Sequence, residues 1–304
     1  MVEVARTAEL DIGYVVTGPE PGRSLVAVHG WPDDVHCWDG VVPFWHEAGY
    51  RVYRPYLRGF GPTRFRAADK MRSGQIGALG HDLAAFLEAL ELDRVLVVGH
   101  DWGARAGYVV GALFPERVAA LVALSAGYAT NRPDAPLSWP LVHAYWYEWF
   151  VATERGRRAM RDDRRSFSRY LWESWAPGWS FSDEEFEQAA VAWDNDDWPP
   201  ITVHAYLHRW GEAAGDEAYD DIEQRLSDPP PVRVPTLVVH GAQDGDNLPE
   251  TTEGKQELFA AGYERVVLPE VGHFPPREVP DKVAELTLRH AKAAEASLHS
   301  SETR

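Results

Sequence analysis

Short apolar runs alternate with helical patterns along most of the chain, and this alternation restricts the fold more than any other feature. Runs typical of strands occur at 10–17, 24–29, 51–55, 94–98, 120–125, 236–240 and 265–269. Helical patterns occur near 38–48, 75–91, from 102 onward, 250–261 and 279–296. Strands that alternate with helices form parallel sheets, and continuous apolar runs are typical where helices cover both faces. We therefore predict an α/β fold with a mostly parallel sheet between two layers of helices.

The segment at 128–229 interrupts this alternation. It contains no strand-like run, and it holds nine of the thirteen tryptophans, most of which are expected to form the segment's own core. The sequence DPPPVRVP at 228–235 is typical of a linker leading back into the sheet. We predict an α/β core formed by residues 1–127 and 230–304, and a helical cap lobe with linkers at 128–229.

The net charge of the chain argues against two classes of binding partner. The 304 residues carry a formal net charge of −17, whereas a nucleic-acid backbone or an anionic membrane requires clustered Lys and Arg. The Arg-rich stretch at 155–169 is interrupted by Asp162 and Asp163, which is typical of a solvated helix face. No nucleic-acid or membrane partner is therefore expected.

Other features of the sequence indicate the compartment and argue against a cofactor. Cys37 is the single cysteine, so an intrachain disulfide is excluded, and residues 1–16 lack the pattern of a secretory signal. We expect a cytoplasmic location.

No nucleotide-binding glycine motif is present, and His204 and His208, although spaced i, i+4, lack the third ligand of a zinc motif. Neither a cofactor nor a metal is therefore predicted.

Residues 99–103, GHDWG, place Asp101 between an apolar strand and a helix. In the related pattern G-x-S-x-G, a strained turn exposes a nucleophile above the sheet. Small residues are needed around such a turn because Cβ atoms there would collide with the strand and the helix. Aspartate is also a common helix N-cap, and the motif alone would favour that interpretation.

Three further strand ends carry groups that would complete a catalytic site. The loop HGWP at 29–32 follows one strand, Asp244 follows a second and His273 follows a third. Ligands of open α/β sheets bind outside the carboxyl ends of the strands, so these groups are expected to converge on Asp101. The order nucleophile, acid, histidine is that of α/β-hydrolase triads. Asp134 is an alternative for the acid.

The chain resembles an α/β-hydrolase in these motifs, and within that fold it resembles the branch of epoxide hydrolases and haloalkane dehalogenases. RPYLRGFGPT at 54–63 also resembles a loop of this branch. The resemblance implies that Asp101 attacks a saturated carbon to form an ester, which water activated by His273 and Asp244 then hydrolyses. The backbone N–H groups of Trp31 and Trp102 would form the oxyanion hole.

In epoxide hydrolases two cap tyrosines protonate the ring oxygen. The resemblance identifies Tyr147, in YEWF at 147–150, as the first and Tyr206, in HAYLHRWG, as the second, with Tyr145 as an alternative to Tyr147. Tentative substrate contacts are Trp31, Trp102, Tyr145 and His204. The aromatic cap suggests a small apolar or aromatic epoxide as the substrate and its hydrolysis to a diol as the reaction.

Other functions remain open at this point. A haloalkane or haloacid dehalogenase would use the same nucleophile, but haloacetate dehalogenases carry Arg where this chain has Trp102. A catalytically inactive ligand-binding homologue is a third interpretation, against which the complete set Asp101, Asp244 and His273 argues. A homodimer is an expectation that rests on the family resemblance alone.

Overall fold

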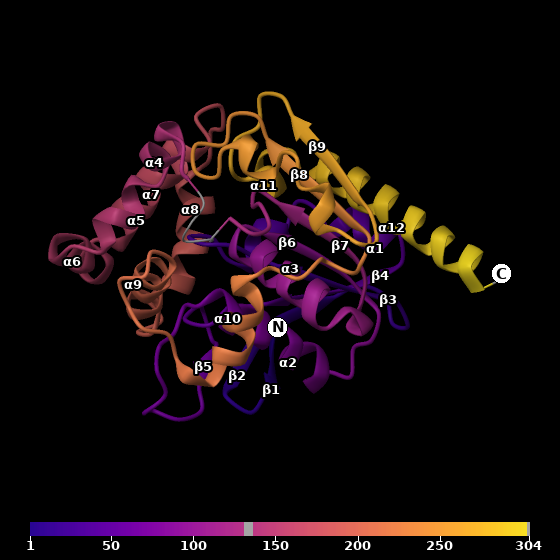
Figure 1. Cartoon of the computed structure of the whole chain (residues 1–304), viewed down its shortest axis with the longest axis horizontal. Coiled ribbons are helices and arrows are strands. Elements are labelled where there is room, and N and C mark those ends of the chain that lie inside the picture. The colour runs from indigo at the N-terminus through magenta and orange to yellow at the C-terminus, as the bar shows by residue number, and fades with distance from the viewer. Residues whose placement is uncertain (131–135, 303–304) are drawn as a thin grey trace.

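The computed structural model describes residues 1–130 and 136–302, and the side chains of residues 1–130 and 136–297. The described residues form one nine-stranded sheet at the centre of the molecule (Figure 1). The strands are β1 Val2–Arg6, β2 Leu10–Thr17, β3 Arg23–Val28, β4 Tyr50–Pro55, β5 Arg64–Phe65, β6 Val95–His100, β7 Val118–Leu124, β8 Thr236–Gly241 and β9 Tyr263–Leu268.

The main strand order is β1-β2-β4-β3-β6-β7-β8-β9, and β5 pairs with β2. The pairs of β1 with β2, β2 with β4 and β2 with β5 are antiparallel. All pairs from β4 to β9 are parallel. The predicted mostly parallel sheet is therefore confirmed, and the carboxyl ends of β3, β6, β8 and β9 lie along one edge.

Helices cover both faces of the sheet, as the continuous apolar strands predicted. Val97 and Val98 of β6 point to opposite faces and belong to two separate apolar clusters. The first cluster contains Leu83 of α2 (Ile76–Ala89) and residues of α3 (Trp102–Leu113), and the second contains Trp45 of α1 (Val42–Glu47) and Leu286 of α12 (Pro280–Glu302). Two buried layers thus hold the sheet in place.

Three local expectations were incomplete or wrong. The sequence analysis assigned no strand to β1 or β5, because β1 buries only Ala5 and β5 has two residues, so neither carries a strong apolar pattern. Residues 250–261 form two 3₁₀ turns, η5 (Pro249–Thr252) and η6 (Gln256–Leu258), instead of a helix. Gly254, with φ of 67°, separates them and interrupts the helical pattern.

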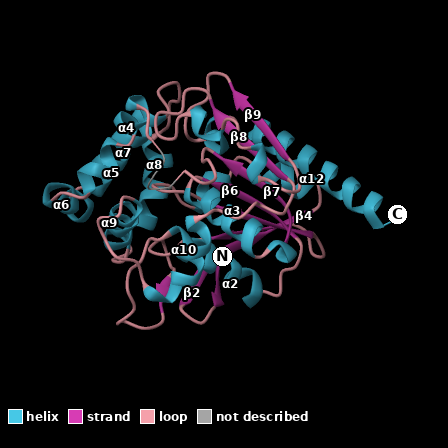
Figure 2. Cartoon of the chain, in the orientation of Figure 1, coloured by secondary structure: helices cyan, strands magenta, loops and turns pink. Residues whose placement is uncertain are grey.

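Between β7 and β8 the described chain is helix and loop (Figure 2). The helices are α4 Trp139–Ala144, α5 Trp146–Val151, α6 Glu154–Asp162, α7 Arg164–Trp175, α8 Asp183–Ala190, α9 Trp198–Arg209 and α10 Asp220–Ser227. In Figure 1, α4 to α9 lie to one side of the sheet, whereas α10 lies beside the core. The backbone N–H of Gly77 in α2 donates to Glu223 of α10 at 2.8 Å. The predicted boundary between core and cap remains a prediction.

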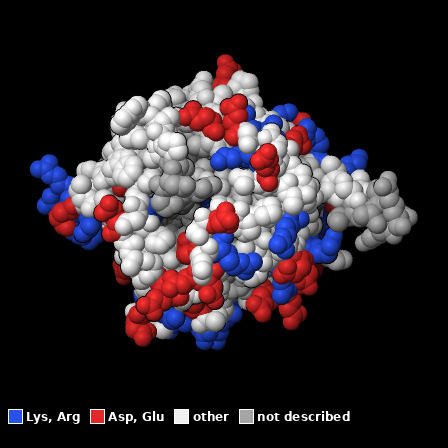
Figure 3. All heavy atoms as spheres, in the orientation of Figure 1, with Lys and Arg blue, Asp and Glu red and all other residues white. Residues whose placement is uncertain are grey.

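The surface carries charge of both signs. On the face shown in Figure 3, Lys and Arg are interspersed with Asp and Glu, and acidic side chains gather along its lower part. Within the described residues, no helix combines the length and the apolar character needed to cross a bilayer.

Candidate active site

Asp101 occupies a strained turn between β6 and α3. Its φ of 48° and ψ of −112° lie outside the common regions for a residue with a Cβ, and such conformations cost about 1–3 kcal/mol. Its side chain makes no capping hydrogen bond to α3, so the N-cap interpretation of the motif is not supported. A Cβ on Gly103 would lie 2.1 Å from the carbonyl oxygen of Val28, which explains why this turn needs glycine.

One oxygen of Asp101 is held by the loop after β3. The backbone N–H of Trp31 donates to Asp101 Oδ1 at 2.9 Å. This close approach requires Gly30, because a Cβ there would lie 2.6 Å from the Cβ of Asp101. Trp102 is the first residue of α3, where backbone N–H groups have no partner within the helix. The arrangement fits the predicted oxyanion hole, which remains a prediction.

His273 and Asp244 form a buried pair beside Asp101. His273 Nδ1 lies 3.0 Å from both carboxylate oxygens of Asp244, and His240 Nε2 lies 3.2 Å from Asp244 Oδ2. Burial alone would lower the pKa of His273, but the charge and hydrogen bond of Asp244 outweigh it and raise the pKa to about 9. In Asp244, burial is outweighed by His273 and His240, which lower the pKa of that carboxyl.

Backbone contacts fix the loop that carries His273. Its N–H donates to the carbonyl oxygen of Trp175, at the end of α7, at 3.1 Å. Its own carbonyl oxygen lies 2.7 Å from His100 Nε2. Burial, with the nearby His273, lowers the pKa of His100 to about 4, so a neutral ring can donate this hydrogen bond at neutral pH. His100, the residue before Asp101, therefore positions His273.

The structure adds Asp246, which the sequence analysis missed. Its Oδ2 lies 4.0 Å from His273 Nε2, on the opposite side of the ring from Asp244, and its side chain is buried. The available signal was a second acidic residue in the loop AQDGDN, two positions after Asp244. One ligand atom each from Asp101, Asp246 and His273 lie within 4.8 Å of one another, so these three could also hold a metal ion.

Aromatic rings pack around the indole of Trp31 above Asp101. The ring of Tyr147, from α5, stacks on Trp31 with centroids 5.6 Å apart, and the ring of Tyr206, from α9, meets Trp31 edge-on at 5.3 Å. The two phenol rings are perpendicular, with centroids 5.2 Å apart. Trp102 stacks on the other side at 6.2 Å. The structure thus brings the two predicted acids together.

Both phenols are protonated at neutral pH. Burial raises the pKa of Tyr147 well above 10, with further contributions from carboxylates that include Asp246 and Asp101. Burial likewise raises the pKa of Tyr206, with Glu148 and Asp101 adding to the shift. Glu148 accepts a hydrogen bond from the Tyr147 hydroxyl at 3.2 Å and is paired with Arg209 at 2.7 Å. Each phenol can therefore donate a proton at neutral pH, and the hydroxyl of Tyr147 is oriented by Glu148.

Two of the tentative substrate contacts have other partners. The Tyr145 hydroxyl donates to Asn247 Oδ1 at 2.9 Å, and Tyr145 does not share the ring contacts that join Tyr147 and Tyr206. The backbone N–H of Gly74 donates to His204 Nδ1 at 3.0 Å, and His204 Nε2 lies 2.9 Å from the carbonyl oxygen of Ala214. This geometry favours Tyr147 over Tyr145 and does not favour contact of His204 with a substrate.

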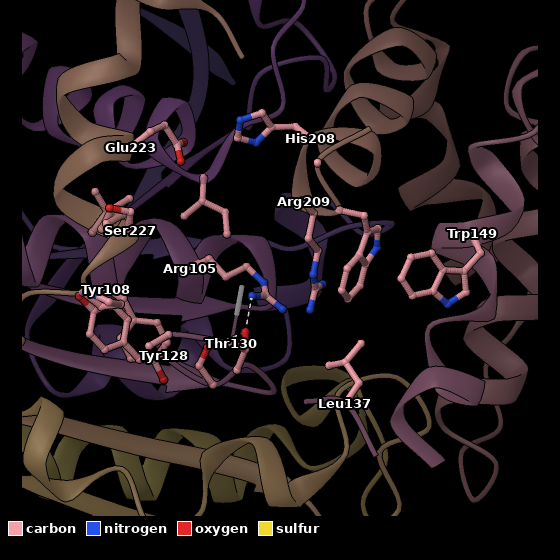
Figure 4. A pocket seen from close by; sticks show the side chains of 18 residues that line it. Arg105, Tyr108, Tyr128, Thr130, Leu137, Trp149, His208, Arg209, Glu223 and Ser227 are labelled. Atoms are coloured by element: carbon pink, nitrogen blue, oxygen red, sulfur yellow. Dashed lines mark hydrogen bonds between the residues drawn. The ribbon is translucent and has the colours of Figure 1, made fainter. Parts of the chain in front are cut away.

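A cavity of about 580 Å³ opens between α3, α9, α10 and the loop after β7 (Figure 4). Its lining is largely apolar and includes Tyr108, Tyr128, Leu137, Trp149 and Trp210. Neither Asp101 nor His273 is part of the lining. This cavity can accommodate the bulk of a ligand, but the reacting atoms must lie deeper.

A smaller space of about 30 Å³ adjoins this cavity. It shares Arg105 and Arg209 with the large cavity and is also lined by Trp102 and Tyr206, which contact each other near the nucleophile. Figure 4 shows the side chains of Arg105 and Arg209 among those that line the large cavity. Asp101 itself is 5% exposed. Asp101 lines neither the large cavity nor the smaller space.

Comparison with known proteins agrees with this geometry. Residues 23–278 match the family model for the alpha/beta hydrolase fold. A crystal structure of a proposed epoxide hydrolase from Klebsiella pneumoniae superposes with a TM-score of 0.90 at 36% identity, covering 96% of this chain and 97% of that one. The chain belongs to the α/β-hydrolase family, in its epoxide hydrolase group. The family resemblance inferred from the sequence motifs is thus confirmed.

Curated relatives of this α/β-hydrolase match over shorter segments. Epoxide hydrolase 2 of Siraitia grosvenorii is 36% identical over 113 residues, which are 37% of this chain and 35% of that protein. Epoxide hydrolase A of Mycobacterium tuberculosis is 36% identical over 112 residues, or 36% and 34% of the two chains. The matched part spans about a third of the length of these curated relatives.

Proposed function

We propose that this α/β-hydrolase opens epoxides to vicinal diols through a covalent ester on Asp101. The observation that carries the proposal is that Asp101 occupies a strained turn and that its carboxylate interacts electrostatically with both phenols of the contacting pair Tyr147 and Tyr206. In the first step Asp101 Oδ2 attacks a ring carbon, the C–O bond breaks, and a phenol donates its proton to the leaving oxygen. Oδ1 stays on the Trp31 N–H.

In the second step water cleaves the ester. Nε2 of His273 takes a proton from the water, whose oxygen attacks the Asp101 carbonyl carbon, while Asp244 holds the imidazole through Nδ1. Negative charge then develops on Asp101 Oδ1, where the N–H groups of Trp31 and Trp102 would stabilise it. As the ester bond breaks, protonated His273 gives its proton to the leaving alkoxide oxygen, and the diol is released. The carboxyl proton that remains on Asp101 passes to the phenolate formed in the first step, which restores the Asp101 carboxylate and the phenol.

The cavity indicates the class of substrate. Apolar and aromatic side chains form most of its lining, so a small apolar or aromatic epoxide such as styrene oxide fits it better than a sugar or a nucleotide. The chemistry uses side chains and water and therefore requires no cofactor. A cytoplasmic location and a homodimer, both expected from the sequence, remain predictions.

The direct test of the ester is isotopic. In a single turnover of styrene oxide in H₂¹⁸O, we expect ¹⁸O in the peptide that contains Asp101 and none in the diol, because water attacks the aspartyl carbonyl carbon. Mass spectrometry of the digested protein and of the product measures both. Label in the diol during the first turnover would mean direct attack of water on the epoxide and would contradict the proposal.

Replacing both phenols tests whether the natural substrate is an epoxide or a haloalkane. We expect Tyr147→Phe with Tyr206→Phe to reduce kcat/KM for styrene oxide by about 10²-fold to 10⁴-fold, because the opening ring loses its proton donors. Steady-state assays of diol formation measure this effect. The single Tyr145→Phe variant is the matched control and should retain most activity.

The same double variant tests the dehalogenase alternative. A halide leaves without a proton, so haloalkane turnover unaffected by the two substitutions and faster than epoxide turnover would contradict the proposal. One contact already argues against a halide site of two indoles. The Trp31 Nε1–H donates to Thr202 Oγ1 at 2.9 Å, which leaves it unavailable for a leaving halide.

A further inference from the structure

Asp246 lies on the side of His273 where the proposed reaction takes place. Asp244 occupies the Nδ1 side of the ring, whereas Asp246 Oδ2 is 4.0 Å from Nε2, the nitrogen that would activate water. One carboxylate oxygen of Asp101, one of Asp246 and one ring nitrogen of His273 lie within 4.8 Å of one another. A carboxyl group that has no part in the mechanism above therefore borders the hydrolytic step.

The distances and the unpaired polar atoms fit one bridging water molecule. A separation of 4.0 Å is too long for a direct hydrogen bond and compatible with a bridging water. His273 Nε2 and Asp246 Oδ1 are both buried and have no hydrogen-bond partner among the described residues. A buried water is stable where two to four polar groups surround it, and Asp101, Asp246 and His273 supply three.

We propose that Asp246 is a further catalytic residue, which holds the hydrolytic water between itself, His273 Nε2 and the Asp101 ester. This inference rests on the proposed function. One O–H of the water points at Nε2 and loses its proton there, and the other O–H donates to Asp246 and is retained. The lone pair of the water oxygen is then directed at the carbonyl carbon of Asp101, and the C–O bond to the diol breaks as before.

The environment of Asp246 argues against a purely structural role. Oδ2 accepts one hydrogen bond, from Asn247 Nδ2 at 2.8 Å, and Oδ1 accepts none among the described residues. The carboxyl groups of Asp101 and Asp244 lie nearby, and burial together with them raises its pKa, against the opposing effect of His273. A buried carboxyl with an unsatisfied oxygen beside other acids destabilises the fold, so stability does not explain its presence.

The test separates the two chemical steps in Asp246→Asn and Asp246→Ala. Rapid-quench mass spectrometry follows formation and loss of the Asp101 ester during a single turnover of styrene oxide. In both variants we expect the rate of ester formation to stay within about twofold of the wild type. Ester hydrolysis should be slower by on the order of tenfold in Asp246→Asn, because the amide retains an acceptor oxygen, and by on the order of a hundredfold in Asp246→Ala. Asp69→Asn, in an exposed loop, is the matched control and should change neither step.

Thermal unfolding gives the second measurement. A catalytic role predicts that Asp246→Asn unfolds at the same temperature as the wild type or above it, because an unsatisfied carboxyl has been removed. A lower unfolding temperature together with equal slowing of both steps would instead show a structural role and overturn the inference.

Two further outcomes have separate meanings. If the ester forms and is cleaved at the wild-type rate in Asp246→Ala, the role of Asp246 is wrong but the proposed function stands. If no ester forms on Asp101 in the wild type, both are wrong. Loss of ester cleavage in the chelator-treated wild type, restored by zinc, would show that the three residues hold a metal and would also overturn the inference.

Discussion

Asp101→Asn should abolish epoxide opening while leaving the fold intact. The amide has the size of the carboxylate, so it can keep the hydrogen bond from the Trp31 N–H that Oδ1 now accepts at 2.9 Å. A neutral amide is a poor nucleophile at saturated carbon, and no ester can form. We expect kcat/KM for styrene oxide to fall by on the order of 10⁴-fold or more, as measured by diol formation under steady state.

The Asp101→Asn variant requires two controls, one for hydrolysis of its amide and one for its stability. Intact-mass measurement shows whether the amide has been hydrolysed to aspartate, which would restore activity without supporting a second nucleophile. Thermal unfolding should give a temperature close to that of the wild type, since the residue keeps its shape at the strained turn. Full activity in a sample whose mass confirms the amide would mean that Asp101 is not the nucleophile.

The reaction centre was predictable where its parts carry local signals. At the glycines around Asp101, an added Cβ atom would lie only 2.1 Å to 2.6 Å from the nearest backbone or side-chain atom. The turn therefore has a fixed sequence pattern. Asp244 and His273 follow apolar strands whose parallel pairing brings them to one edge of the sheet. A strand and the residue after it can be recognised in sequence, and the convergence then follows from topology.

The parts that were not predictable depend on contacts between distant segments. Whether Tyr145 or Tyr147 faces Tyr206 depends on how α5 packs against α9, since Tyr145 and Tyr147 are both buried. Asp246 acquires its position only because the loop after β8 folds around His273 from the loop after β9. Asp134, the alternative acid, lies outside the described residues, and the geometry of Asp244 makes the stronger case.

The cavity could not be predicted from the sequence either. Its lining comes from α3, α9, α10 and the loop after β7. The first and the last of these elements along the chain, α3 and α10, are more than a hundred residues apart, and the segments show no common pattern. The sequence indicated an aromatic cap, and aromatic rings indeed fill the space around Trp31. The cavity itself, whose lining includes Arg105 and Arg209, follows from side-chain packing alone.

His273→Gln should stop turnover after the first step and leave the protein as a stable ester. Gln cannot accept the proton from water, whereas Asp101 still attacks the epoxide beneath Tyr147 and Tyr206. We expect a mass increase equal to one styrene oxide on the peptide that contains Asp101, and multiple turnover reduced by on the order of 10³-fold or more. An adduct on a peptide that lacks Asp101 would overturn the assignment of the nucleophile.

Lowering the pH should reproduce part of this effect in the wild type, because His273 must be neutral to act as a base. Burial opposes protonation of the ring, but Asp244 outweighs burial and raises the pKa of His273 to about 9 in the free protein. Ester formation removes the charge of Asp101, one of the groups that raise this pKa, so the pKa of His273 in the ester lies lower.

Ester hydrolysis should therefore slow about tenfold for each pH unit below a midpoint under about 9, with ester accumulating at acidic pH. His273→Gln should lose this dependence, and if it kept the wild-type pH profile of ester hydrolysis, another group would have to be the base.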